Sequence, residues 1–231
     1  MTPASDWFET LPKHRLMAEY SLWSADLLNI GPDMDRVDKH VDLYHVDVAD
    51  GHFSPALLYF PDLVAACRKR SAKPFHVHQM VADGILLDQI DQFAEAGADL
   101  ISVHAENANA GAALERIAGH GRRAGIVLQL HSKLEAARPW LGQIAMLTLL
   151  GTRIGVKGQG LDPEAEARLR AARALIGARG IVLAADGGIR EHTVPGLAAH
   201  GAQTIVMGSL AFGAADLAAR MAWVHAQPLM G

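Results

Sequence analysis

The chain has 231 residues, half of them hydrophobic, and a formal net charge of −4. That length and apolar content favour one large α/β domain over two small ones. The small net charge and the intermixed acidic and basic residues give no basic stripe for a nucleic acid. The single cysteine, Cys67, excludes an intramolecular disulfide and a thiolate metal cluster.

The N-terminal segment, residues 1–15, is polar and contains acidic residues. It lacks the apolar centre of a signal peptide, and no run reaches the roughly 18 apolar residues that span a membrane. We therefore expect a soluble, cytoplasmic protein with no membrane partner. These first residues are expected to form a short extension before the first strand.

Short β-like runs alternate with amphipathic helical patterns along the chain. Strands are predicted at Glu19–Ala25, Leu43–Val48, Phe75–Met80, Leu100–His104, Gly125–Leu130, Met146–Leu150, Ile181–Ala185 and Thr204–Met207. Helices are predicted between them, for example at Ile85–Ala96 and Pro163–Ala178. Strands and helices alternating in this way predict a single (β/α)8 barrel over residues 1–231, with a doubly wound parallel sheet as the structural alternative.

Polar side chains stand near the C-terminal ends of three strands, where a barrel collects its catalytic groups. These residues are His45 and Asp47 in the second strand, His76 and His78 in the third, and Asp186 after the seventh. Because side chains alternate along a strand, the two polar residues of the second strand share one face, as do those of the third. The intervening Val46, Val48 and Val77 are then expected to face the helices.

Two imidazoles and two carboxylates that converge at one barrel mouth form a site for one divalent metal ion. Such nitrogen and oxygen ligands suit zinc, iron, manganese or cobalt, and the sequence does not choose among them. A single histidine is more simply interpreted as a hydrogen-bonded core residue. The full set favours a metal because unpaired buried charges are costly; it consists of His45, Asp47, His78 and Asp186.

Five segments, in order, resemble the signature segments of the ribulose-phosphate 3-epimerase family: "SLWSAD" from Ser21, "HVDVADGHFSP" from His45, "HVHQM" from His76, "AADGGI" from Ala184 and "VMGSLAFG" from Val206. The resemblance covers residues from about 17 to 225. It implies a barrel of the ribulose-phosphate-binding type, one divalent metal ion and epimerisation at C3 of a ketose phosphate. The default pair is D-ribulose 5-phosphate and D-xylulose 5-phosphate, and the resemblance also implies a homo-oligomer.

Carried over position by position, the resemblance implies specific roles for residues of this chain. The metal ligands fall on His45, Asp47, His78 and Asp186, and the acid/base pair falls on the two aspartates. Inverting C3 requires removal of a proton on one face and its return on the other, which two carboxylates can perform. A metal ion stabilises the enediolate formed between these steps. Ser21 matches a serine near the substrate, and Met80 a methionine that lines the site.

Glycines near the last strands predict a phosphate site. Gly187 and Gly188 follow the seventh strand, and Gly208 and Ser209 follow the eighth. Glycines let backbone N–H groups approach an anion closely, and phosphate sites recur at these two loops of the barrel fold. By themselves these residues indicate only tight turns; beside the metal set they favour phosphate binding.

The sixth loop departs from the family's usual Pro-Gly-Phe-Gly-Gly-Gln, because this chain reads "IGVKGQ" from Ile154. Gly155 and Gly158 are retained and belong to the predicted substrate site. Lys157 or Arg153 either contacts an anionic group or is a solvated loop charge.

Two further residues leave alternatives open. Asp50 either supports the site or forms a turn with Gly51. His76 replaces the family's usual aspartate before Val-His, and its role is open. Nearby substrate walls also differ from the family, as at Ala49 and Leu150, which stand where the family tends to have methionines.

Three other functions compete with the default one. The site could act on another sugar phosphate, such as a tetrulose or hexulose phosphate. A phosphate-binding barrel decarboxylase uses a lysine among aspartates after the third strand, and "HVHQMVADG" has none. A non-catalytic sugar-phosphate-binding barrel does not need two proton-transfer groups, which argues against it.

Overall fold

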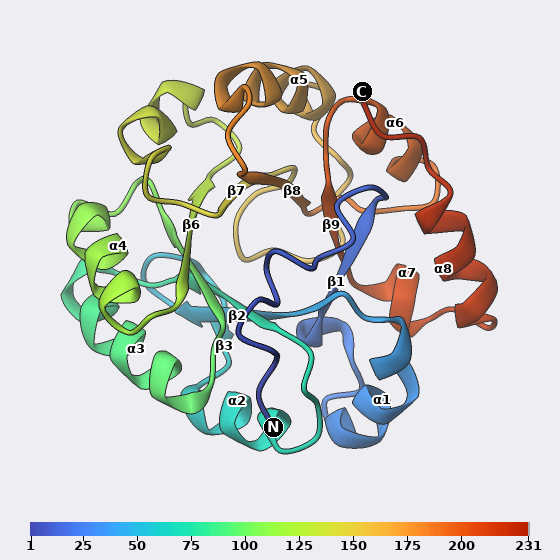
Figure 1. Cartoon of the computed structure of the whole chain (residues 1–231), viewed down its shortest axis with the longest axis horizontal. Coiled ribbons are helices and arrows are strands. Elements are labelled where there is room, and N and C mark those ends of the chain that lie inside the picture. The colour runs from blue at the N-terminus through green and yellow to red at the C-terminus, as the bar shows by residue number, and fades with distance from the viewer. Residues whose placement is uncertain (231) are drawn as a thin grey trace.

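Eight parallel strands close into a barrel in the computed structural model, which describes residues 1–230 (Figure 1). The barrel closes because β1 pairs with both β2 and β9. The barrel strands are β1 (Met17–Ser21), β2 (Leu43–Asp50), β4 (Phe75–Met80), β5 (Leu100–His104), β6 (Arg123–Leu128), β7 (Met146–Leu150), β8 (Val182–Asp186) and β9 (Thr204–Met207). The predicted (β/α)8 barrel is confirmed, and the doubly wound alternative is wrong.

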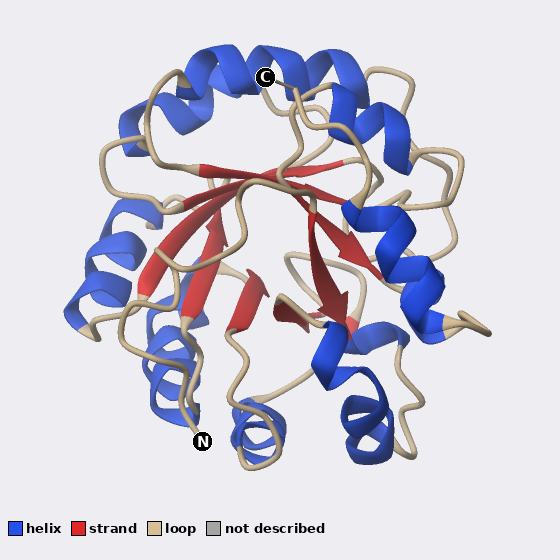
Figure 2. Cartoon of the chain, turned by 45° about the vertical axis from the view of Figure 1, so that its right-hand side comes forward, coloured by secondary structure: helices blue, strands red, loops and turns tan. Residues whose placement is uncertain are grey.

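Helices surround the barrel on its outside (Figure 2). They are α1 (Ile30–Val37), α2 (Pro61–Arg68), α3 (Asp83–Ala96), α4 (Ala110–Gly119), α5 (Ala165–Ile176), α6 (Val194–Ala199), α7 (Ser209–Phe212) and α8 (Leu217–His225). The described residues also include three 3-10 helices, namely η1 (Leu22–Ser24), η2 (Asp38–His40) and η3 (Leu134–Trp140). A two-residue strand, β3 (Leu57–Leu58), pairs antiparallel with the end of β2. Within residues 1–230, no helix combines the length and apolarity needed to cross a membrane.

Four strands, β4, β5, β7 and β9, have the predicted bounds. The first strand was predicted at Glu19–Ala25, but it begins at Met17 and ends at Ser21, where η1 follows. The fifth was predicted at Gly125–Leu130, but it begins at Arg123. Both strands begin earlier than predicted because their first residues pair with neighbouring strands, Met17 with Thr204 and Arg123 with Leu100.

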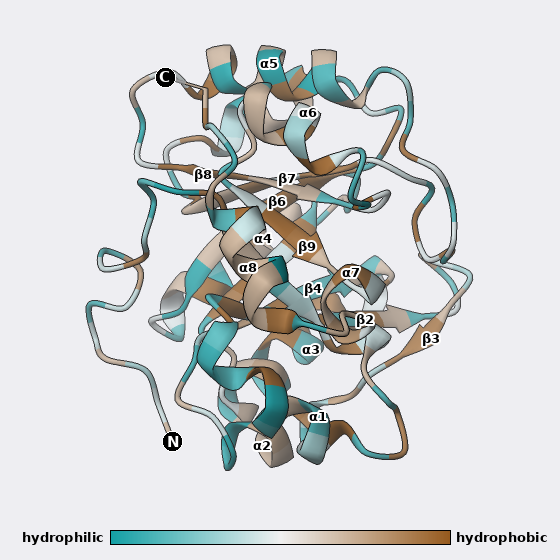
Figure 3. Cartoon of the chain, turned by 90° about the vertical axis from the view of Figure 1, so that its right-hand side faces the viewer, coloured by the Kyte–Doolittle hydropathy of each residue, from teal (hydrophilic) through white to brown (hydrophobic). Residues whose placement is uncertain are grey.

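Apolar side chains pack on both surfaces of the barrel wall. Val46, Val48 and Val77 belong to the large core between strands and helices, as predicted; in Figure 3 hydrophobic colour concentrates on the strands. Inside the barrel, a smaller cluster joins Phe8 to Met17, Leu100, Met146, Val182 and Ala184.

Phe8 comes from the N-terminal extension, which crosses the barrel opening in Figure 1. The first residues of the chain therefore close the end of the barrel at which the strands begin. The opposite end, where the strands finish, remains available for a site.

Candidate active site

The predicted metal ligands lie on β2, β4 and β8, and their side chains converge inside the barrel. Strand register explains the convergence, since Asp47 is directly opposite His78 on the neighbouring strand. Asp186 is the last residue of β8. The imidazoles of His45 and His78 are buried, and the side chain of Asp186 is 16% exposed.

The distances within this cluster are short and even. His45 Nε2 lies 3.3 Å from Asp47 Oδ1 and 3.9 Å from Asp186 Oδ2. His78 Nδ1 lies 3.4 Å from Asp47 Oδ1 and 3.6 Å from Asp186 Oδ2. Four atoms bound tetrahedrally to one ion at about 2.0–2.1 Å lie about 3.4 Å from one another. The four distances are close to this spacing, so these donors could hold a single divalent ion.

The hydrogen bonding of the two imidazoles also fits a metal. His45 Nε2 and His78 Nδ1 are buried and have no hydrogen-bond partner among residues 1–230. Buried polar atoms without partners are rare and costly, so two that face the same carboxylates need an explanation. A divalent ion held by these nitrogen and oxygen atoms would satisfy both imidazoles.

The other nitrogen of each imidazole has a protein partner. His45 Nδ1 is 2.9 Å from Glu19 Oε2, a carboxylate on β1. His78 Nε2 is 2.9 Å from His104 Nε2, on β5. Sequence reasoning missed both partners, since neither Glu19 nor His104 belongs to a recognisable motif. Burial lowers the pKa of His104 to about 4, so this imidazole is neutral at pH 7.

The two aspartates have opposite electrostatic environments. Burial alone raises the pKa of Asp47, but the imidazoles of His45 and His78 outweigh burial and bring this pKa well below its usual range. Burial raises the pKa of Asp186 to about 6; His45 opposes this shift and the Asp47 carboxylate adds to it. Asp47 is therefore ionised, while Asp186 takes up a proton more readily than an ordinary aspartate.

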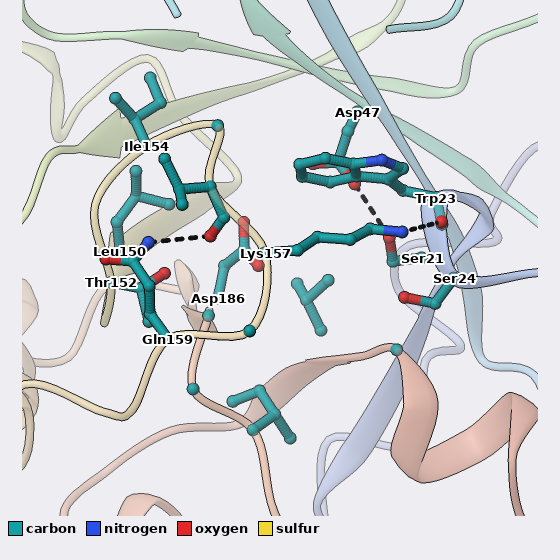
Figure 4. A pocket seen from close by; sticks show the side chains of 18 of the residues that line it. Ser21, Trp23, Ser24, Asp47, Leu150, Thr152, Ile154, Lys157, Gln159 and Asp186 are labelled. Atoms are coloured by element: carbon teal, nitrogen blue, oxygen red, sulfur yellow. Dashed lines mark hydrogen bonds between the residues drawn. The ribbon is translucent and has the colours of Figure 1, made fainter. Parts of the chain in front are cut away.

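A cavity of about 430 Å³ opens above the cluster. Its lining contains every residue of the predicted site except His45, which lies beneath: Ser21, Asp47, His78, Met80, Gly155, Gly158, Asp186, Gly187, Gly188, Gly208 and Ser209. Ser21 Oγ donates a 2.9 Å hydrogen bond to Asp47 Oδ2 (Figure 4). The predicted metal ligands and the predicted phosphate loops thus face one cavity.

The loop after β7, residues 151–161, forms one wall of this cavity. Lys157 extends across the cavity (Figure 4), and its ammonium donates to the carbonyl oxygen of Trp23 and lies 4.7 Å from the centre of the Trp23 ring. Burial lowers the pKa of Lys157. Arg153 Nε instead donates to Gln159 Oε1 within the loop, at 3.1 Å. Of the two loop cations, Lys157 is therefore the one that reaches over the site.

Two residues of open role have structural partners. Asp50 accepts hydrogen bonds from the backbone N–H groups of His52, Phe53 and Ala82, so it joins the turn after β2 to the segment after β4. His76 lies below the cluster, bonded to Glu19 and Ser102.

Solved structures with this fold include a 3-hexulose-6-phosphate synthase, with a TM-score of 0.67 and 18% identity, covering 92% of this chain and 100% of that one. An orotidine 5′-phosphate decarboxylase from Pyrococcus horikoshii gives a TM-score of 0.65 and 14% identity, covering 91% of this chain and 98% of that one. At such low identity, these likenesses show the barrel fold alone.

Sequence comparison is more specific. The chain is 34% identical over 212 residues to a ribulose-phosphate 3-epimerase of Synechocystis sp., covering 89% of this chain and 91% of that protein. It is 34% identical over 204 residues to ribulose-phosphate 3-epimerase 1 of Cupriavidus necator, covering 85% and 84%. The model of the "Ribulose-phosphate 3 epimerase family" matches residues 17–212. The predicted resemblance is confirmed, and the chain belongs to the ribulose-phosphate 3-epimerase family, whose members are isomerases.

Proposed function

We propose that this chain epimerises a ketose phosphate at C3, with D-ribulose 5-phosphate and D-xylulose 5-phosphate as the default pair. The observation that carries the proposal is the convergence of two unpartnered imidazole nitrogens and two carboxylates beneath one cavity. Family membership supports the same reaction, because the relatives named above are ribulose-phosphate 3-epimerases.

His45, Asp47, His78 and Asp186 would hold one divalent metal ion. When bound, such an ion acts as a Lewis acid that stabilises negative charge on the substrate's oxygen atoms. The donor set suits zinc, iron, manganese or cobalt.

The two aspartates would carry the proton across the substrate. They stand on β2 and β8, so a ketose between them presents one face of C3 to each. Asp47, held ionised by the imidazoles, removes the proton from C3, and Asp186, with its raised pKa, delivers a proton to the opposite face. In the reverse direction the two exchange roles. The Ser21 hydroxyl, which donates to Asp47 Oδ2, would orient this base.

The phosphate group of the substrate would lie on the side of the cavity formed by the loops after β8 and β9. Gly187 and Gly188 have φ values of +88° and +72°, a left-handed conformation that other residues rarely adopt. A side chain at Gly187 would also overlap Thr152 Oγ1. Both features leave the backbone close to the cavity, where N–H groups of this loop and of Gly208 and Ser209 could donate to phosphate oxygens.

One observation favours a different substrate, a tetrulose or hexulose phosphate. Lys157 crosses the cavity at a position where the family has a glycine-rich loop, which changes both the charge and the room available to the substrate. A tetrulose or hexulose phosphate, reacting by the same chemistry, is the alternative.

Deuterium exchange distinguishes these substrates. Metal-loaded protein would be incubated in deuterated water with ketose phosphates of four, five and six carbons, and NMR would follow deuterium at C3. Rapid exchange and epimer formation with ribulose 5-phosphate support the default pair. Exchange only with another ketose phosphate supports the proposed reaction and identifies that compound, rather than ribulose 5-phosphate, as the substrate. Absence of exchange with all of them contradicts the proposed reaction.

We further propose that the chain forms a homo-oligomer. Leu57 on β3 and the nearby Phe60 are 80% and 60% exposed, which is unusual for large apolar side chains. Tyr59 between them is half-buried and donates to the Leu22 carbonyl at 2.7 Å. Light scattering on the purified chain tests this proposal, and a monomer at micromolar concentration contradicts it.

A further inference from the structure

The two imidazoles of the candidate metal site face it with different nitrogens. His45 presents Nε2 to the carboxylates of Asp47 and Asp186, whereas His78 presents Nδ1. A neutral imidazole carries one proton, so the nitrogen that faces the site is a metal ligand only if the proton sits on the other one. The two histidines therefore need opposite tautomers, and the partner of each distal nitrogen decides which tautomer forms.

Glu19 is the partner of His45. It lies on β1 with no exposed surface, and its Oε2 is 2.9 Å from His45 Nδ1. A carboxylate accepts hydrogen bonds only, so His45 Nδ1 carries a proton, and a neutral His45 then keeps its lone pair on Nε2. Among the described residues, no backbone carbonyl accepts a hydrogen bond from His45 Nδ1. The tautomer of His45 therefore depends on the Glu19 carboxylate.

Glu19 is itself fixed by a second imidazole. The same oxygen, Oε2, lies 2.6 Å from His76 Nδ1, and His76 Nε2 lies 2.7 Å from Ser102 Oγ on β5. Gly125 on β6 leaves the room for that hydroxyl, since a side chain there would overlap Ser102 Oγ. His76 on β4 and Ser102 on β5, with Gly125 on β6 leaving room for them, thus hold the Glu19 carboxylate beneath His45.

This lower trio is not a second metal site. Glu19, His45 and His76 do lie close enough together to suggest one. However, both imidazoles approach the same carboxylate oxygen, Oε2, at direct hydrogen-bond distances, so this oxygen and the two N–H groups satisfy one another and leave no room for an ion between them.

Glu106 reaches His78 through one intermediate. Its Oε2 is 3.1 Å from His104 Nδ1, which therefore carries a proton. His78 Nε2 and His104 Nε2 lie 2.9 Å apart and can share only one proton. Because the proton of His104 is on Nδ1, His78 Nε2 is the donor, and the lone pair of His78 is left on Nδ1. The other oxygen of Glu106 accepts from Gln129 N at 3.0 Å and from the Ser132 hydroxyl, which hold the acid in place.

We propose that Glu19 and Glu106 are positioning residues that select opposite tautomers of the two metal-binding histidines. Glu19 keeps the proton of His45 on Nδ1, and Glu106, acting through His104, keeps the proton of His78 on Nε2. This inference rests on the proposed function only in assigning the two histidines to a metal. Carboxylates that fix a ligating histidine in this way contribute about 10- to 100-fold to metal affinity or activity.

The first test uses the unaltered protein loaded with zinc. Long-range proton–nitrogen NMR of protein labelled with ¹⁵N-histidine reports which ring nitrogen is protonated, and the signals are assigned by their loss in His45→Asn and His78→Asn variants. We expect protonated Nδ1 in His45 and protonated Nε2 in His78. The same tautomer in both residues, or rapid averaging in either, overturns the proposal.

The second test measures zinc affinity by competition with a chromophoric chelator. Glu19→Gln keeps the shape of the side chain and removes its charge, and we expect it to weaken zinc binding at least tenfold; Glu106→Gln, which acts through an intermediate, is expected to have a smaller effect. Asp99→Asn is the matched control, because Asp99 is also buried but pairs with Arg68 away from the site. It should lower thermal stability without changing zinc affinity.

The outcomes separate this inference from the proposed function. Unchanged zinc affinity in Glu19→Gln, or an equal loss in Asp99→Asn, contradicts the positioning role. If Glu19→Gln does not fold, the tautomers measured in the unaltered protein still test the proposal. Wild-type protein that binds zinc and shows opposite tautomers, yet exchanges deuterium into none of the ketose phosphates, refutes the proposed reaction and leaves the positioning role intact.

Discussion

The floor and the rim of the cavity are built differently. The floor consists of side chains on β2, β4 and β8, and strand pairing fixes their positions; Asp47 and His78 are opposite partners. The rim on one side is the loop of residues 151–161, which contains no regular secondary structure. The floor keeps all four residue types of the family pattern, whereas the loop has lost three of its six. Under the proposed function, the strands would determine the reaction and the loop would adapt the site to its substrate.

Removing the metal should have the largest effect, because it empties the floor of its proposed ion. We expect dialysis against a strong chelator to abolish deuterium exchange at C3, and zinc, iron, manganese or cobalt, added singly, to restore it to different extents. Melting temperature should rise on reloading, since an ion that binds only the folded chain stabilises it by about 2.7 kcal/mol at 100 times its Kd. Full exchange in protein shown to be metal-free would contradict the assignment of the floor.

Replacing either acid of the floor should be nearly as severe. Asp186→Asn preserves the size of the side chain but cannot transfer a proton, and Asp47→Asn removes the proposed base. General acid–base groups contribute roughly 10²- to 10⁴-fold, so turnover should fall by about a thousandfold or more in each variant. Metal content must be measured alongside, because both residues are proposed ligands. Near-normal turnover in Asp47→Asn would refute the acid/base assignment.

On the rim, Lys157 should affect substrate binding more than the chemical step. Its ammonium lies over the cavity, and burial has already removed part of its hydration. A hydrogen bond to a charged group contributes about 1.5–3 kcal/mol, so Lys157→Met should raise KM about tenfold or more while kcat changes little. Steady-state kinetics on the preferred ketose phosphate gives both constants.

Arg153→Met is the matched control for Lys157, since Arg153 is a cation of the same loop whose Nε bonds to Gln159. It should change KM less than twofold. An equal rise in KM for the two variants would mean that the loop contributes only general positive charge, and that the reach of Lys157 across the cavity is irrelevant.

Sequence reasoning was most successful where a local pattern determines position. Alternation along β2 and β4 placed His45, Asp47 and His78 correctly on the inner face. The loops predicted to bind phosphate line the same cavity, and phosphate binding itself stays a prediction. Glu19 was missed because a single acid in a strand has no distinguishing pattern. Its role depends on the lateral register of β1, β2 and β4, and no local stretch of sequence contains that information.

The direction of a loop side chain was equally beyond prediction. Lys157 and Arg153 were indistinguishable in sequence as loop cations. They differ because one meets Trp23 of η1, 134 residues away in the chain, and the other meets Gln159 in its own loop. Asp50 was open for the same reason, since one of its partners, Ala82, follows a different strand.

The smallest expected effects come from two glycines that connect rim and floor. Gly155 and Gly158 have φ values of +68° and +80°, so alanine at either position strains the backbone, by roughly 1–2 kcal/mol. They differ in their surroundings. A side chain at Gly155 would overlap Ser54 Oγ, in the segment after β2, whereas a side chain at Gly158 meets nothing within 4 Å.

Because the backbone strain is common to both, the difference between Gly155→Ala and Gly158→Ala isolates the contact of the loop with the segment after β2. We expect a modest loss of thermal stability in both, and a rise in KM of a few fold in Gly155→Ala alone, since only that variant displaces the loop from Ser54. Equal KM values would show that the rim holds its position without this contact. A larger rise in KM for Gly155→Ala would show that the segment after β2, the strand that carries Asp47, also determines the position of the loop. The floor and the rim would then be structurally coupled.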